Sequence, residues 1–156
     1  ILNHVCRLDM ERSKKTGMPE DDFDKMPQPF RNTTVESVMA YMKAQFSYWT
    51  EDETACNFRR MLTLEQYRNP EMANLYQKVL ASGPVNYIED LFREMMLSGT
   101  WLEGSPRQMA VEFFAPFYLL LSMSDAASGK EEKEKVAVLF TTHLECFVET
   151  YAAKMP

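Results

Sequence analysis

Histidine and cysteine residues lie close together at two places in this sequence. His143 and Cys146 are three residues apart, and His4 and Cys6 are two residues apart. On a helix the first pair would lie on adjacent turns, whereas residues two apart point in different directions. A structural zinc site needs four ligands, and no second pair of ligands accompanies either motif. We therefore expect no metal and no cofactor, and we expect these side chains to pack as ordinary residues.

The sequence also lacks the motifs that usually position catalytic groups. It contains no Glu-x-x-His pair of a di-iron bundle, no glycine-rich nucleotide loop and no Gly-x-Ser-x-Gly nucleophile turn. No nucleophile is grouped with a base along the chain. We therefore expect that the protein is not an enzyme.

Methionine and aromatic residues recur at helical spacing and are more informative than the histidines. The plain interpretation is a filled core. The alternative is a cavity for a small, mainly apolar or planar ligand, because flexible methionines and aromatic rings adapt to such ligands. Glu65, Arg68 or Asn57 would then supply a polar contact. The residues expected to line the cavity are Met39, Met42, Phe46, Phe58, Met61, Leu62, Tyr76, Tyr87, Met95, Trp101 and Phe114.

Composition and charge restrict the class of protein. The 156 residues are 46% hydrophobic, which suits one globular domain, and the net charge of −6 argues against direct binding of a polyanion. The three cysteines are far apart and odd in number, as in proteins of a reducing compartment. No signal peptide or transmembrane run is visible. We expect a cytoplasmic protein that does not bind a membrane.

The elements that must position these side chains are all predicted to be helices. Apolar residues recur at three- and four-residue spacing, and strand-like alternation is absent. We expect an all-α bundle of about six or seven helices. Residues 1–16 would be the end of a helix that enters from an earlier segment, 17–32 a polar loop, and 33–156 the domain itself. The predicted helix starts and breaks are Thr33-x-x-Glu36, Thr50-x-x-Glu53, Asn69-Pro70, Ser82-Gly83-Pro84 and Ser105-Pro106.

The helix predicted between Ser105 and Asp125 is apolar on almost every side, and Pro116 should kink it. Its centre, Phe113 to Leu121, contains no charged residue. A helix that is apolar all round must be covered on all sides, and this one is shorter than the roughly 20 apolar residues that span a bilayer. We therefore expect its own domain to cover one surface and a partner to cover another.

Several stretches resemble the ligand-binding domain of TetR/AcrR-family transcriptional repressors. The segment from Phe58 to Ala73, FRRMLTLEQYRNPEMA, carries the resemblance together with Tyr87–Met96. The start at Ser105-Pro106 with Phe113-Phe114-Ala115-Pro116 is similar to the family's penultimate helix. The opening Ile1–Val5 resembles the long helix that joins the DNA-reading head to this domain.

The resemblance implies a ligand-responsive repressor. It implies a homodimer in which the last two helices of each subunit form a four-helix bundle, with a small-molecule effector held between the middle helices. Operator DNA would be bound by an N-terminal helix-turn-helix head that this sequence does not contain. The alternative is a stand-alone helical scaffold that binds a different protein. The candidate dimer residues are Phe113, Phe117, Leu120, Leu121, Phe140, His143, Leu144, Phe147 and Tyr151.

Overall fold

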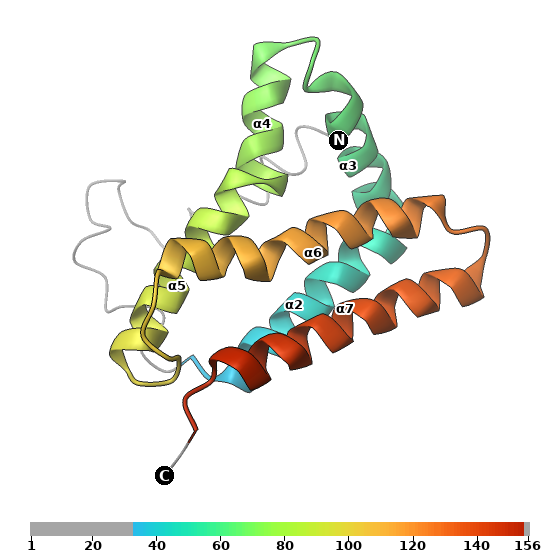
Figure 1. The fold of residues 1–156 in the computed structure, drawn as a ribbon. Coiled ribbons are helices and arrows are strands. Elements are labelled where there is room, and N and C mark those ends of the chain that lie inside the picture. Colours follow the sequence, from blue (N-terminus) through green and yellow to red (C-terminus); the bar gives the residue numbers. More distant parts are fainter. Residues whose placement is uncertain (1–32, 155–156) are drawn as a thin grey trace, which may run out of the picture.

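The computed structural model describes residues 33–154, and every regular element in them is a helix apart from one isolated bridge between Trp101 and Ala152. The expectations for residues 1–16 and 17–32 lie outside the described residues. The all-α class is confirmed. The helices are α2 (Val35–Glu51), α3 (Glu53–Glu65), α4 (Pro70–Leu80), α5 (Ser82–Leu97), α6 (Pro106–Ala126) and α7 (Lys130–Tyr151) (Figure 1).

Two of the predicted capping boxes are displaced. Helix α2 is capped by Thr34, whose hydroxyl accepts from the Ser37 amide at 3.1 Å while Ser37 caps in return, so the box lies one residue after the predicted Thr33. Helix α3 is capped by Asp52, which accepts from the Ala55 amide at 2.8 Å. Thr50 lies within α2 and donates to the carbonyl of Phe46. A carboxylate caps better than a threonine, which explains the shift.

The predicted starts of α4 and α6 are confirmed. Asn69 caps α4 and Ser105 caps α6, and in each case a proline occupies the first turn. Pro116 lies inside α6 without ending it. Gly99 follows the end of α5, and its positive φ of 77° is a left-handed conformation that favours glycine.

The predicted break lies one residue earlier than expected, and Ser82, Gly83 and Pro84 form the first turn of α5. The chain turns at Ala81, where φ is −130° and ψ is −96°, and α5 begins at the next residue. Gly83 passes so close to α4 that an added Cβ would lie 1.9 Å from the carbonyl oxygen of Lys78. The sharp junction therefore depends on a residue without a side chain.

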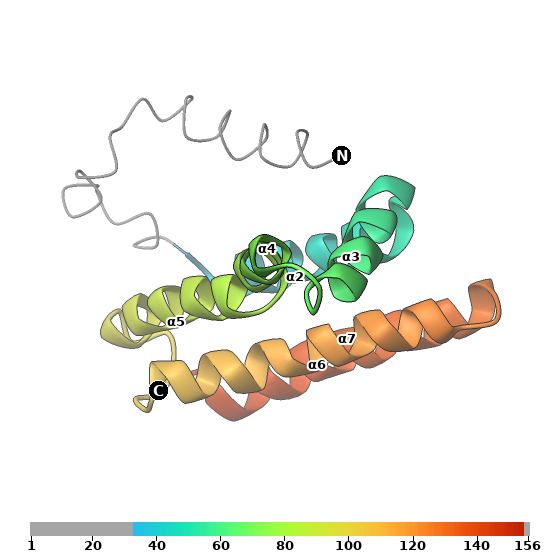
Figure 2. The ribbon, with the colours of Figure 1, turned by 90° about the horizontal axis from the view of Figure 1, so that it is seen from above.

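The helices form two layers around a main core. Helices α6 and α7 run antiparallel on one side of the molecule, and α3, α4 and α5 lie on the other (Figure 2). Helix α2 packs against both α6 and α7. Aromatic rings fill the space between α2, α6 and α7. The ring centroids of Phe46 and Phe140 are 4.7 Å apart, and those of Phe113 and Phe147 are 4.8 Å apart. We call the buried cluster of α2, α5, α6 and α7 the main core.

A second, small core joins α3 to α4. It consists of Phe58, Leu62, Tyr76 and Leu80, all nearly inaccessible to solvent. Trp49, at the end of α2, packs against both cores. The α3–α4 hairpin is thus a unit with its own apolar centre, placed on the main body through Trp49 and the α4–α5 junction.

The expectation that this helix is too short to span a bilayer was wrong: α6 has 21 residues and the length and apolar composition of a membrane span. Eight of its residues are nevertheless buried against the rest of the chain.

Candidate functional site

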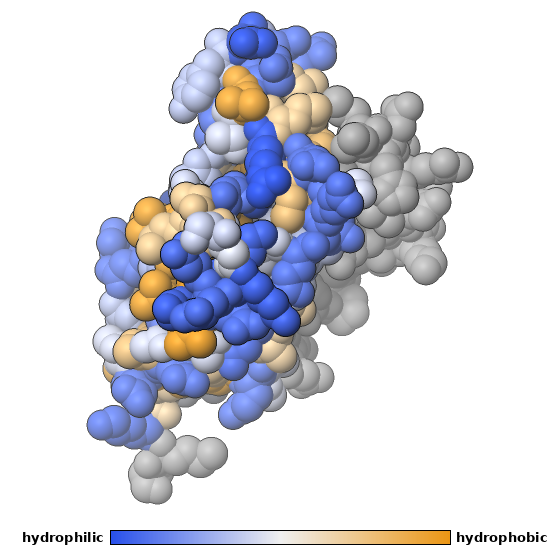
Figure 3. Space-filling model, turned by 90° about the vertical axis from the view of Figure 1, so that its right-hand side faces the viewer, coloured by the Kyte–Doolittle hydropathy of each residue, from blue (hydrophilic) through white to orange (hydrophobic). Residues whose placement is uncertain are grey.

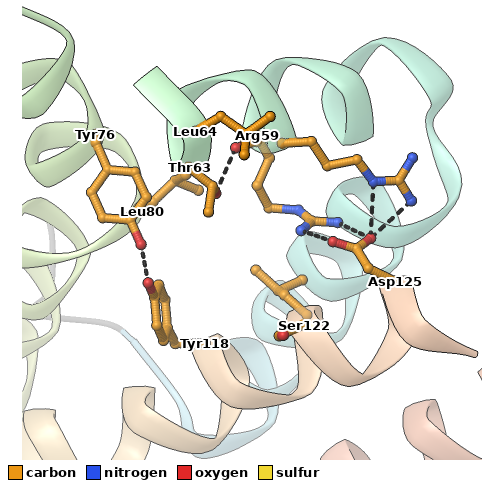
Figure 4. Close-up of a pocket in the computed structure, with 10 residues that line it drawn as sticks. Arg59, Thr63, Leu64, Tyr76, Leu80, Tyr118, Ser122 and Asp125 are labelled. Atoms are coloured by element: carbon orange, nitrogen blue, oxygen red, sulfur yellow. Dashed lines mark hydrogen bonds and ion pairs between the residues drawn. The ribbon is translucent and has the colours of Figure 1, made fainter. Parts of the chain in front are cut away.

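A pocket of about 490 Å³ lies where the small core meets α6. This volume is within the usual range of small-molecule sites, roughly 300–1,000 Å³. Three helices supply its walls, and the side chains from α3, α4 and α6 point toward one another (Figure 4). The lining residues are Arg59, Arg60, Thr63, Leu64, Tyr76, Leu80, Tyr118, Leu121, Ser122 and Asp125.

One end of the pocket is an ion pair between α3 and α6. Arg59 holds both oxygens of Asp125, with Nη1–Oδ2 at 2.7 Å and Nη2–Oδ1 at 2.8 Å. Its Nε and Nη2 also donate to the carbonyl of Trp49, at 3.3 and 3.2 Å. The side chain of Arg59 is only 6% exposed, and that of Asp125 is 28% exposed. A buried guanidinium that is satisfied on both sides fixes α3 against α6.

Arg60 reaches the same carboxylate from the solvent side. Its Nε and Nη2 donate to Oδ1 of Asp125 at 3.2 and 2.9 Å, and its side chain is 46% exposed. Partial burial would raise the pKa of Asp125, but the hydrogen bonds and charges of the two arginines lower it below its usual value. Burial by itself would lower the pKa of Arg59, but the hydrogen bond to Asp125, the charge of Asp125 and the contacts with Cys56 together raise it. Asp125 is therefore ionised at neutral pH.

The other end of the pocket is a pair of tyrosine hydroxyls. Tyr76 of α4 and Tyr118 of α6 meet hydroxyl to hydroxyl, and their rings pack edge to face. Burial and the hydrogen bond with Tyr118 raise the pKa of Tyr76. The Tyr76 hydroxyl thus stays protonated and can donate or accept a hydrogen bond.

The methionines and aromatic residues predicted to line a cavity do not surround this pocket. Only Tyr76 of that set lines it. Phe58, Leu62 and Met61 fill the small core, and Tyr87 is 52% exposed. Filled cores and apolar pockets use the same residue types, so composition alone does not distinguish the two. The main core contains the rest of the set, namely Met39, Met42, Phe46, Met95, Trp101 and Phe114.

The residues predicted to supply polar contacts lie outside this pocket. Glu65 and Arg68 pair with each other at 3.3 Å, and Asn57 is exposed. None of the three lines the pocket. Of the polar residues that line the pocket, Arg59 could have been recognised from the sequence, because it lies on the buried side of α3 together with Ala55 and Leu62. A charge on an apolar stripe requires a buried partner.

The predicted dimer residues face inward. Phe113, Phe117 and Leu120 are 1%, 4% and 6% exposed. They pack in the main core, so they cannot form an outer surface of this chain. The same is true of Leu121, Phe140, Leu144 and Phe147. His143 and Tyr151 are partly buried, with the His143 ring 2.9 Å from the Phe113 carbonyl and the Tyr151 hydroxyl bonded to Glu112.

The opposite side of α6 carries the exposed apolar residues that the sequence prediction missed. Val111, Ala115, Leu119 and Met123 follow one another at four-residue intervals, and all are exposed. This spacing places them in one row along the helix, which we call the outer stripe. On α7, Val138 and Leu139 are exposed as well. Viewed from the side where α6 and α7 are joined, hydrophobic residues reach the surface between hydrophilic ones (Figure 3).

His143 and Cys146 have separate surroundings. Cys146 is exposed on α7, whereas His143 is directed at Phe113. Between residues 33 and 154, no three His, Cys, Asp or Glu side chains come close enough together to hold a metal ion.

Comparison with protein-family models, curated proteins and solved structures finds no match for this chain. The class that fold and site define is an all-helical protein with a three-helix pocket and an exposed apolar row on α6.

Proposed function

We propose that this chain is the regulatory domain of a ligand-responsive repressor of the TetR type. It binds a small, mainly apolar effector in the pocket between α3, α4 and α6, and it dimerises through α6 and α7. Operator DNA is bound by a helix-turn-helix head that the printed sequence does not contain. The proposal rests on the sequence resemblance together with one structural observation.

That observation is that α6 serves two surfaces. Tyr118, Leu121 and Asp125 line the pocket, and the outer stripe runs along the same helix. A ligand shifts a conformational equilibrium only when it binds one state better than another. A ligand that moves α6 relative to α3 acts directly on the helix that would carry the partner subunit. Because one helix lines the pocket and carries the outer stripe, binding of an effector can be coupled directly to the proposed dimer contact.

The α3–α4 hairpin supports the proposal by its construction. Its small core is separate from the main core. Helix α3 packs closely against α2 and α4, and it reaches α6 through the long side chains of Arg59 and Arg60. A unit with its own apolar centre can tilt as a rigid body, because its internal packing is kept while its contacts with the rest of the chain change. Such contacts switch between a few discrete arrangements.

The test uses the intact gene product, including whatever is encoded before Ile1. We expect a basic three-helix head there, and footprinting should show two protected half-sites about 34–36 Å apart. Addition of extracted effector should release the DNA. An intact protein with no such head, or one whose DNA occupancy never changes with any cell extract, would contradict the proposal and favour the helical scaffold.

A further inference from the structure

The pocket carries an excess of positive charge although the chain as a whole is acidic. Its lining includes two arginines and a single carboxylate, Asp125, while the net charge of the chain is −6. A site that is locally positive in an acidic protein favours an anionic ligand.

The hydrogen bonds of Asp125 show where that anion would be held. Oδ1 accepts from three nitrogens, namely Nη2 of Arg59 and both Nε and Nη2 of Arg60. A carboxylate oxygen has about two lone-pair sites, so this oxygen is oversubscribed. Arg59 is the deeper and better held of the two arginines. Arg60 is therefore the one that can turn from Asp125 to a second carboxylate with little loss.

The rest of the pocket sets the size and character of the ligand. Leu64, Leu80 and Leu121 provide apolar walls between the arginine end and the tyrosine end. Tyr118 and Asp125 are seven residues apart on α6, which corresponds to about 10 Å along a helix. A compact apolar body of that length would fill the space between the two polar ends.

We propose that the effector is a monocarboxylic acid with an aromatic or aliphatic body about 10 Å long. Its carboxylate pairs with the Arg60 guanidinium in place of part of the Asp125 contact, and its body lies against the three leucines. The planar fork of arginine matches a carboxylate in two-point contact, and Arg60 already binds one through two nitrogens. The inference rests on the proposed function in one respect, that this pocket is the effector site.

The test compares two probes of nearly the same shape, one with a charged carboxylate and one with a neutral amide. 2-Naphthaleneacetate and 2-naphthaleneacetamide share the ring system, and calorimetric titration of the full chain measures the affinity of each. We expect the acid to bind about ten- to a hundredfold more tightly, the usual effect of a charge-assisted hydrogen bond. In Arg60→Gln the preference should fall to within about threefold, while affinity for the amide stays unchanged.

Arg93→Gln is the matched control. Arg93 is exposed on α5, pairs with Glu89 and Asp90 at 2.9 and 2.8 Å, and is absent from the pocket lining. The substitution removes the same charge as Arg60→Gln does, but outside the pocket. The preference for the acid should therefore remain. Equal binding of both probes by the parent chain, a preference that survives Arg60→Gln, or binding of neither probe would overturn the inference. The repressor proposal is tested separately by DNA footprinting, which uses neither probe.

Discussion

At the scale of the residue, two neighbouring arginines carry the same charge but are held very differently. Arg59 is buried and holds both Asp125 and the Trp49 carbonyl, whereas Arg60 is half exposed. We expect Arg59→Met to lower the free energy of unfolding by about 2–4 kcal/mol, because it leaves a partly buried carboxylate and a carbonyl without their main partner. Arg60→Met should cost under about 1 kcal/mol, as exposed pairs do. Urea denaturation measures both, and equal losses would contradict the assigned burial.

The same carboxylate makes stability depend on pH. Because the folded chain holds the pKa of Asp125 below its ordinary value, the unfolded chain takes up the proton first as pH falls. The contribution of the pair is complete above the unfolded pKa of about 3.9 and is lost as the pH drops through the lower folded value. Unfolding titrations between about pH 6 and pH 2.5 should show a steeper loss for the parent chain than for Asp125→Asn. Parallel curves would show that Asp125 does not titrate as assigned.

At the scale of the element, the α4–α5 junction depends on Gly83. An alanine there would place its Cβ 1.9 Å from the Lys78 carbonyl oxygen, and that atom belongs to backbone that cannot turn aside. We expect Gly83→Ala to lower stability by about 1–3 kcal/mol, the usual cost of overpacking, although alanine is the better helix former. Gly129→Ala is the control, since a Cβ added at Gly129 would meet no atom within 4 Å. Gly129 is the N-cap of α7, where alanine is a weaker capping residue, so a small loss is expected there too. Thermal unfolding should show a clearly larger loss for Gly83→Ala than for Gly129→Ala.

The ends of helices could be predicted from sequence, but their orientation could not. Asn69-Pro70 and Ser105-Pro106 give local signals that need no tertiary information, and both helices begin there. Near the end of α2 two capping residues compete, and the carboxylate of Asp52 prevails over Thr50. Helix α6 is apolar all round, so its periodicity contains no information about which side faces the core. Packing against α2, α5 and α7 decides that, and it selects the phenylalanines for the inside.

The pocket was less predictable than the helices for a related reason. Its residues come from three helices and its ends are polar, whereas the prediction sought methionines and aromatic rings with a polar contact from Glu65, Arg68 or Asn57. Those residues are the ones that fill the two cores. Arg59 was the available signal, because it interrupts the apolar stripe of α3. Its partner Asp125 lies 66 residues away, and no rule of local spacing connects them.

At the scale of the whole molecule, the outer stripe of α6 and the exposed residues of α7 define the surface at which a second copy would pack. Val111, Leu119 and Met123 are 42%, 59% and 42% exposed. Covering them and Leu139 in both subunits would contribute on the order of 6–12 kcal/mol, given about half the value of full burial for each side chain. That sum is comparable to the cost of association. The proposed dimer is therefore expected to tolerate few defects at this surface.

If the chain forms the proposed dimer, Leu119→Glu should convert it into a folded monomer, because the substitution places a charge in the middle of the outer stripe while leaving the core untouched. Leu97→Glu is the control, since Leu97 is exposed at the end of α5, away from the outer stripe.

Phe117→Glu should instead unfold the chain, because its ring packs on Phe46 and Phe140. Light scattering gives the masses, and circular dichroism gives the helix content. A parent chain that is monomeric at every concentration would leave the outer stripe to a different protein and the regulatory-domain proposal without its dimer.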